Sequence, residues 1–180
     1  MTLSKTFSLD NSTQSIQTVD YAHHEIHSGS SFFIHNSATI ANNEVNTISF
    51  KTPNSTKQVH FTYEVSASGA GTFDLLESVT SVAGGTASTP LNRYRDSTTT
   101  STVTAPLKGD TTGADPVVPT GGTNIYSIEL GAGQRDGGED RSTHELILKK
   151  NAIYLLRFTS TGAGNKTSLI ANWYEHTPKS

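Results

Sequence analysis

Apolar and polar residues alternate in short runs along much of the chain, at the two-residue period of β-strands. The clearest run is 58–66, whose alternating apolar positions are Val59, Phe61, Tyr63 and Val65. Because successive side chains of a strand point to opposite faces, this run predicts a strand with one buried face. No stretch has a sustained 3.6-residue period flanked by capping residues. The pattern therefore predicts an all-β protein.

The last third of the chain carries three strand-like runs. Residues 145–149 and 153–159 flank the short polar turn 149–152, which is typical of a β-hairpin. The third run, 167–174, contains Trp173, the chain's only tryptophan, in an apolar setting. We expect this tryptophan in the core.

Further strands are predicted upstream at 45–50, 72–82, 97–103 and 125–130, and residues 21–36 predict two strands around a turn at 28–30. The total of about eight to ten short strands suits a sandwich or a jelly roll. We therefore expect a single-domain β-sandwich, jelly-roll-like, over residues 21–180.

Two segments depart from the alternating pattern. Residues 1–20 are mostly polar, and their few apolar positions, among them Leu3, Phe7 and Leu9, are too sparse for a core of their own. We predict that this segment is an extended N-terminal arm that becomes ordered against something else. Residues 86–123 are rich in Thr, Ser, Gly and Pro, which predicts long loops that project from the sandwich.

The length, the lack of cysteine and the net charge of the chain exclude several classes of protein. A chain of 180 residues with 33% hydrophobic content holds one domain with a sizeable core, and the absence of cysteine excludes disulfides and thiolate sites. The net charge of −3 and the scattered basic residues argue against binding to nucleic acid. No run is apolar or long enough for a signal peptide or a membrane helix, so we expect neither export nor membrane insertion.

A histidine-rich cluster, HHEIH at 23–27, is the sharpest local motif. On a strand, His23, Glu25 and His27 would share one face, as in sites that bind transition metals. A cupin site needs spaced glycines and a second histidine motif as well, and the sequence has neither. We therefore favour sheet or interface histidines, with no metal and no cofactor.

Catalytic sets are missing from the sequence. There is no Gly-x-Ser-x-Gly elbow, although serines, threonines and histidines are abundant. Asp136, Glu139 and Asp140 lie in a glycine-rich loop that could offer oxygen ligands to calcium, but their spacing favours solvated acids. We expect that the protein is not an enzyme.

Arg93, Tyr94 and Arg95 form the only dense patch of large side chains in the 86–123 region. Tyrosine and arginine are enriched at the centres of protein interfaces, so this triplet is the predicted contact site. The alternative is that Tyr94 packs back on the sheet between two solvated arginines.

Four segments together resemble small β-rich proteins encoded in the head-gene region of tailed bacteriophages. They are YAHHEIHSGSSFF (21–33), NRYRDS (92–97), GGEDRSTHELILKKNAIYLLR (137–157) and WYEHT (173–177). The resemblance implies a capsid decoration or cement protein, made in the bacterial cytoplasm, that binds the major capsid protein at capsomer junctions on the outside of the shell, often as a trimer. On this basis Leu3, Phe7 and Leu9 would anchor the arm, and residues 93–95 would contact a neighbouring subunit.

Two other functions remain open. A carbohydrate-binding or receptor-recognition module of a tail fibre could stack Tyr94, Tyr126 and Trp173 on sugars. A cupin-like metalloenzyme would depend on the 23–27 cluster alone.

Overall fold

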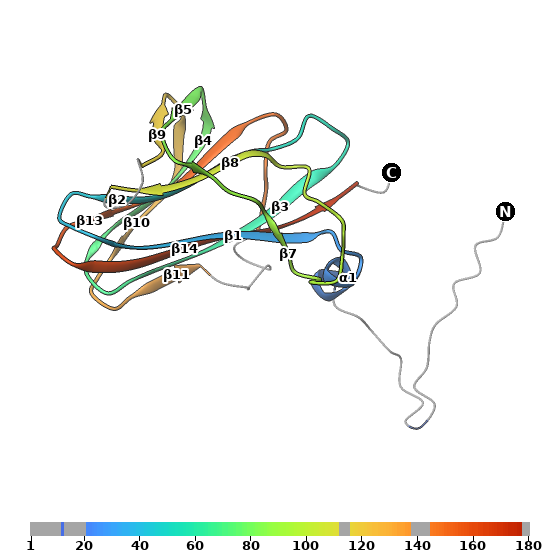
Figure 1. Cartoon of the computed structure of the whole chain (residues 1–180), viewed down its shortest axis with the longest axis horizontal. Helices are drawn as coiled ribbons and strands as arrows, with labels where there is room; N and C mark the ends of the chain where they lie inside the picture. The colour runs from blue at the N-terminus through green and yellow to red at the C-terminus, as the bar shows by residue number, and fades with distance from the viewer. Residues whose placement is uncertain (1–11, 13–20, 112–115, 138–144, 178–180) are drawn as a thin grey trace.

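The computed structural model describes residues 12, 21–111, 116–137 and 145–177, which contain one short helix and fourteen strands. The prediction of an all-β, sandwich-type domain is confirmed: two antiparallel sheets pack face to face (Figure 1). The predicted arm, residues 1–20, falls outside the described residues except for Ser12, so the expected anchors Leu3, Phe7 and Leu9 are not placed. No helix within the described ranges has the length and apolar character needed to cross a membrane.

The first sheet has the order β11-β3-β14-β1-β7, and β12 pairs with β3 beside β11. Its strands are β1 (Ser31–Ile40), β3 (Gln58–Ala67), β7 (Leu91–Asn92), β11 (Arg135–Gly137), β12 (Leu146–Ile147) and β14 (Asn165–His176). The long strand β14 lies in the middle and pairs with both β1 and β3 along most of its length.

The second sheet has the order β10-β4-β13-β2-β8-β6. Its strands are β2 (Val45–Lys51), β4 (Gly71–Val79), β6 (Thr86–Ala87), β8 (Thr104–Asp110), β10 (Thr123–Leu130) and β13 (Ile153–Ser160). A separate pair, β5 (Ser81–Ala83) with β9 (Val118–Thr120), lies over the outer side of this sheet. β1 pairs with the last strand and β2 with the penultimate one, in opposite sheets, which is the arrangement of a jelly roll.

The core lies between the two sheets and follows the alternation in the sequence. In β3 the alternating residues from Val59 to Val65 are all buried there, as predicted. Trp173 is completely buried and stacks on Phe50 of the opposite sheet, with ring centroids 5.6 Å apart. Each large apolar side chain buried in this way contributes about 1.5–3 kcal/mol.

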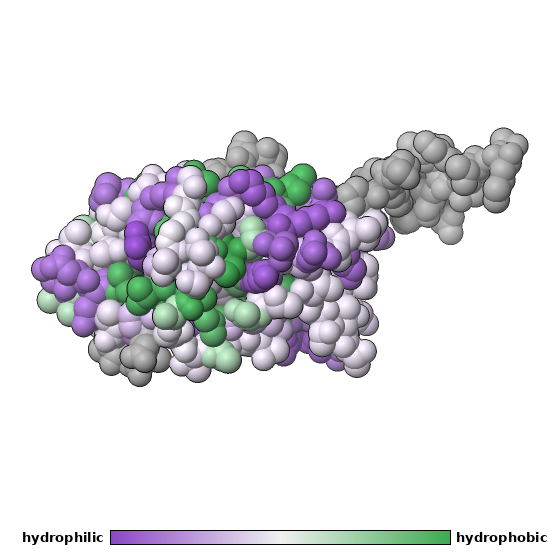
Figure 2. Space-filling model, turned by 90° about the horizontal axis from the view of Figure 1, so that it is seen from above, coloured by the Kyte–Doolittle hydropathy of each residue, from purple (hydrophilic) through white to green (hydrophobic). Residues whose placement is uncertain are grey.

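A smaller apolar cluster covers the outer face of the second sheet. Leu76, Val79, Val117 and Leu155 form it, under the β5–β9 pair. The face seen in Figure 2 carries apolar side chains among polar ones. Val118 of β9 is 54% exposed. The β5–β9 pair therefore closes a second layer of packing outside the main core.

The predicted hairpin of residues 145–149 and 153–159 is wrong. β12 pairs with β3 of the first sheet, whereas β13 pairs with β2 and β4 of the second. The polar turn between them, with Asn151 in a left-handed conformation (φ 53°), carries the chain from one sheet to the other. The physical reason is that Leu148, just after β12, and the buried residues of β13 enter the same core from opposite sheets.

Residues 21–36 also differ from the prediction of two strands. Residues 21–27 form the helix α1 (Tyr21–His27), which ends in a Schellman motif: the amides of Gly29 and Ser30 donate to the carbonyls of Ile26 and Glu25. Gly29 takes the positive φ of 73° that this cap requires. The glycine that predicted a hairpin turn is therefore a helix C-cap.

The 86–123 region is only partly a projecting loop. Its described part adds β7 to the edge of the first sheet, adds β8 and then the edge strand β6 to the second sheet, and pairs β9 with β5. The strand predicted at 97–103 is wrong, because this stretch has no strand structure. Its polar groups bind a buried carboxylate instead of a neighbouring strand, as shown below.

Candidate functional site

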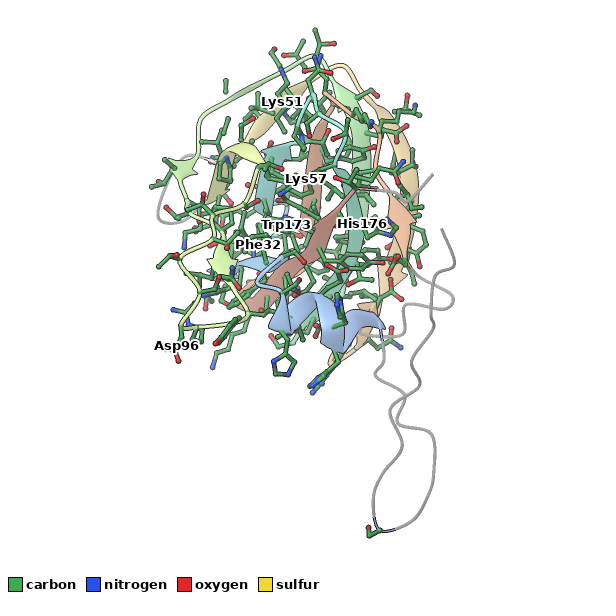
Figure 3. All side chains as sticks on the ribbon, turned by 90° about the vertical axis from the view of Figure 1, so that its right-hand side faces the viewer. Phe32, Lys51, Lys57, Asp96, Trp173 and His176 are labelled. Carbon is green, nitrogen blue, oxygen red and sulfur yellow. The ribbon has the colours of Figure 1, made fainter. Side chains whose placement is uncertain are left out.

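The predicted contact triplet lies at one end of the sandwich, next to α1. We call this region the α1 end and define it as α1, β7 and residues 93–101. Figure 3 looks onto it, with α1 in front and Asp96 to one side. Because residues 1–20 precede α1 in the sequence, the predicted arm joins the domain at this same end.

Arg93 does not point freely into solvent. Its guanidinium donates to Oδ1 of Asn172 over 2.7 Å and lies over the ring of Phe33, 5.7 Å from the centroid. Asn172 is 1% exposed and donates in turn to Glu64. Arg93 therefore fastens the beginning of the 93–101 segment to the outer face of the first sheet.

Asn92 joins this segment to the end of the helix. Its side-chain amide donates to the carbonyls of Gly29, over 2.8 Å, and Thr99, over 3.1 Å. Its side-chain oxygen accepts from the amide of Tyr94. These three bonds explain why a segment without strand structure is held in one conformation.

Tyr94 and Arg95 are the exposed members of the triplet. Tyr94 is 44% exposed, and Arg95 is exposed and donates to the carbonyl of Asn92 over 3.2 Å. A cavity of about 330 Å³ opens beside Arg95. Its lining comes from residues 89–92 and 97–101 as well. The triplet thus divides into one docked arginine and an exposed Tyr–Arg pair, which matches neither sequence-based interpretation in full.

Glu175 holds the far side of the 93–101 segment, and the sequence pattern did not single it out. Its carboxylate is 3% exposed. It accepts from the amide and hydroxyl of Thr102, over 3.0 and 2.6 Å, and from the Ser101 hydroxyl, over 2.5 Å. The indole N–H of Trp173 donates to the same carboxylate over 3.1 Å. A buried carboxylate with four donors locks the loop to the core.

A buried histidine–carboxylate cluster lies on the outer face of the first sheet. His60 Nδ1 is 2.6 Å from Oε1 of Glu145, and the Tyr174 hydroxyl donates to that oxygen over 2.9 Å. The His176 ring is 4.5 Å from the His60 ring, centroid to centroid. Burial and the neighbouring His60 lower the pKa of His176.

This cluster has part of the arrangement of a catalytic triad. A carboxylate orients the imidazole through Nδ1, as in serine hydrolases. His60 is only 7% exposed, however, and within the described part of the chain no hydroxyl is hydrogen-bonded to its Nε2. Among the described residues, the cluster therefore has no nucleophile beside His60. Its hydrogen bonds hold Glu145 against His60 of β3 and Tyr174 of β14.

The histidines of α1 are arranged differently from the strand-based prediction. Because 21–27 is a helix, His23 and His27 share one face and Glu25 does not. Glu25 is 6% exposed, and the hydroxyls of Ser28 and Ser30 bond to its carboxylate. Its burial removes it from the ligand set that the sequence suggested.

The remaining candidates differ in their surroundings. Asp136 accepts from the hydroxyls of Tyr63 and Tyr126, over 3.0 and 3.2 Å, and burial raises the pKa of Tyr63. Glu139 and Asp140 lie outside the described residues. Of the aromatic side chains considered for sugar stacking, Trp173 is buried and Tyr126 is half-buried, which leaves Tyr94 exposed.

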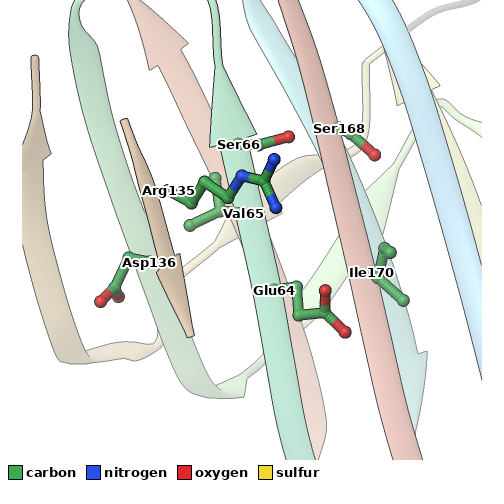
Figure 4. Close-up of a pocket in the computed structure, with 7 residues that line it drawn as sticks. All are labelled: Glu64, Val65, Ser66, Arg135, Asp136, Ser168 and Ile170. Atoms are coloured by element: carbon green, nitrogen blue, oxygen red, sulfur yellow. The ribbon is translucent and has the colours of Figure 1, made fainter. Parts of the chain in front are cut away.

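A second cavity, of about 260 Å³, lies on the outer face of the first sheet (Figure 4). Arg135 reaches over β3 there, while Asp136 points to the other side of β11. The other lining residues are Glu64, Val65, Ser66, Ser168 and Ile170. The lining residues carry one cation, two carboxylates and two hydroxyls, and one of the carboxylates, Asp136, points away from Arg135. This is not a catalytic arrangement, so the α1 end remains the best candidate site.

Comparison of the chain with models of known protein families finds no match, and neither curated proteins nor solved structures show significant similarity to it.

Proposed function

We propose that the protein is a structural virion protein that decorates and cements the outer surface of an icosahedral phage capsid, and that the α1 end is its contact surface. The observation that carries this proposal is the construction of the α1 end. The segment 93–101, which has no strand structure, is held by Arg93 and by the buried Glu175, and it presents an exposed Tyr–Arg pair.

Such a surface suits binding between proteins. Loops held in one conformation lose little entropy on binding, and tyrosine and arginine supply most of the energy at interface centres. The arm segment joins the domain at the same end, so both parts of the predicted contact surface would meet one neighbour. Leu3, Phe7 and Leu9 would then pack on that neighbour and add apolar area to the interface.

The protein would stabilise the capsid because its binding is linked to the assembly of the shell. A protein that binds the assembled shell, and not free capsid subunits, shifts the equilibrium towards the shell by the free energy of binding. Many copies at capsomer junctions add these contributions, and a trimer of the chain would engage several capsid subunits at once. The major capsid protein is the proposed partner, and the proposed function involves no catalysis and no cofactor.

The experiment is cosedimentation of the purified chain with emptied, expanded heads of its phage. We expect saturable binding and a rise in the melting temperature of the head. Arg95→Ser should weaken binding at least about fivefold, as for an interface residue worth more than about 1 kcal/mol. Arg135→Ser is the matched control, since Arg135 is also exposed but lies on β11.

A second variant tests the arm separately. Deletion of residues 1–20 should lower occupancy on the heads, while the melting temperature of the isolated domain stays unchanged. Unchanged occupancy would refute the role of Leu3, Phe7 and Leu9. Failure of the full chain to bind heads, together with retention on host surface glycans, would replace the proposal with a receptor-recognition module of a tail fibre.

A further inference from the structure

Two histidines of α1 stand one helical turn apart on its exposed side. His23 and His27 are both exposed, and their Nε2 atoms are 2.9 Å apart. Residues i and i+4 of a helix are neighbours on its surface, so the backbone itself brings the two rings together. The same spacing places the two zinc-binding histidines of His-Glu-x-x-His helices. Here residue 24 is histidine, so the general base of such enzymes is missing.

The two Nε2 atoms are at the distance of an N–H···N hydrogen bond, and the ring geometry would equally fit one metal ion in place of the shared proton. The ring centroids are 4.5 Å apart and the rings are inclined by 68°. Two nitrogens bound at a right angle to one metal ion, with bonds of about 2.0–2.1 Å, would be about 2.9 Å apart. Rings that radiate from that ion would have centroids about 4.5 Å apart. Both spacings in the structure agree with these values.

The 2.9 Å spacing of the two nitrogens corresponds to an angle of about 90° between two metal–nitrogen bonds, and this angle favours some metals over others. Two nitrogens on a tetrahedral ion, at about 109°, would be about 3.3 Å apart with the same bond lengths. A right angle is instead the angle between neighbouring ligands in the square-planar or tetragonal geometry of Cu²⁺ and Ni²⁺. Cu²⁺ also binds nitrogen ligands most tightly among the divalent metals of this series.

Among the described residues, the two histidines are exposed and no third metal ligand stands beside them. Glu25 is buried against Ser28 and Ser30, and His24 lies 3.7 Å from Glu25. Within the described ranges, no group of three histidine, cysteine, aspartate or glutamate side chains could hold a metal ion. The protein would thus supply two ligands, and water or a group from another molecule would fill the remaining positions.

We propose that His23 and His27 form a two-imidazole site on α1 for a tetragonal divalent transition metal, with Cu²⁺ bound most tightly and Ni²⁺ next. The site lies on the α1 end but does not depend on the function proposed for that surface. It needs no further residue of this chain, because both ligands come from one helix turn.

Calorimetric titration of the full chain with Cu²⁺ alone, in a buffer that does not bind metal, tests the proposal. We expect one equivalent to bind at this site. His23→Ala and His27→Ala should each weaken binding at least about tenfold, because the second imidazole acts at high effective concentration. Alanine is the better helix former, so neither substitution weakens α1.

Two control variants make the result specific. His24→Ala removes a histidine from the same helix, and His35→Ala removes an exposed one from β1; both should leave the Cu²⁺ affinity unchanged. Electron paramagnetic resonance of the bound Cu²⁺ should show two nitrogen ligands, and one in either single variant. Binding that survives both His23→Ala and His27→Ala, or that falls equally with His24→Ala, would overturn the proposal.

Discussion

Replacing Glu175 with glutamine should destabilise the whole domain and release residues 99–102 from it. The carboxylate accepts from four donors: the indole of Trp173, the Ser101 hydroxyl, and the amide and hydroxyl of Thr102. A glutamine keeps one acceptor oxygen and places an N–H₂ group where the second oxygen stood. Oε1 accepts from the indole, the Ser101 hydroxyl and the Thr102 amide, so the N–H₂ group takes the place of Oε2 and the Thr102 hydroxyl loses its acceptor. The other three bonds lose the negative charge that strengthens them.

A buried donor without a partner costs about 1–3 kcal/mol, so Glu175→Gln should lower the free energy of unfolding by about 1–3 kcal/mol. A domain of this kind has about 5–15 kcal/mol in total, so the variant should still fold. With a urea m-value of about 2 kcal/mol/M, the unfolding midpoint should fall by about 0.5–1.5 M. Urea titration followed by Trp173 fluorescence measures this change directly.

The matched control is Glu129→Gln. Glu129 is exposed and also accepts a hydroxyl hydrogen bond, from Thr72 over 2.8 Å. Its substitution should change stability by less than about 0.5 kcal/mol. Amide hydrogen exchange supplies a second readout, since the Thr102 amide should exchange much faster in Glu175→Gln than in the control. A midpoint of Glu175→Gln within about 0.3 M of the wild type would refute the reasoning.

Two further predictions concern the second sheet. Gly71→Ala should lower the free energy of unfolding by about 3 kcal/mol or more, because the added Cβ would overlap the carbonyl oxygen of Thr159. Gly162→Ala, which has open space around the added Cβ, should lower it little. Equal urea midpoints for the two variants would contradict this prediction. Burial alone would raise the pKa of Asp74, but hydrogen bonds from Arg157 and two polar neighbours outweigh it and hold the pKa below its ordinary value. The stabilisation from Asp74 is therefore complete above about pH 4, the unfolded pKa, and is lost as the pH falls through the lower folded pKa. Unfolding midpoints from pH 6 to pH 2 should accordingly fall less steeply in Asp74→Asn, and parallel profiles would exclude this role.

Much of the fold was predictable because β-alternation is a local property of the chain. Residues 58–66 form the greater part of β3, and the runs at 152–160 and 167–174 correspond to β13 and β14. In each, the side chains that point into the core recur at every second position, so a short window contains the whole signal. Burial of Trp173 followed from the same local pattern.

Strand pairing was not predictable in this way. The apolar runs before and after the turn at 149–152 looked like two halves of a hairpin, yet they belong to different sheets. In a jelly roll, neighbours in space are separated by long connections, and only the closed core decides which strands meet. The helix at 21–27 was missed for a related reason, since the cap at Gly29 uses the same residues as a turn.

The composition of the candidate site was visible in the sequence, whereas its geometry depended on the tertiary structure. Residue type alone singled out Arg93 and Tyr94 as contact residues. Only the fold turned Arg93 onto Asn172 and left Tyr94 exposed. Glu175 gave no signal, because its partner Thr102 is 73 positions away along the chain. Local periodicity thus determined the strands, whereas contacts between distant segments determined the site. The hydrogen bonds from Thr102 to the buried carboxylate of Glu175 exist only once both segments have been folded against the same core.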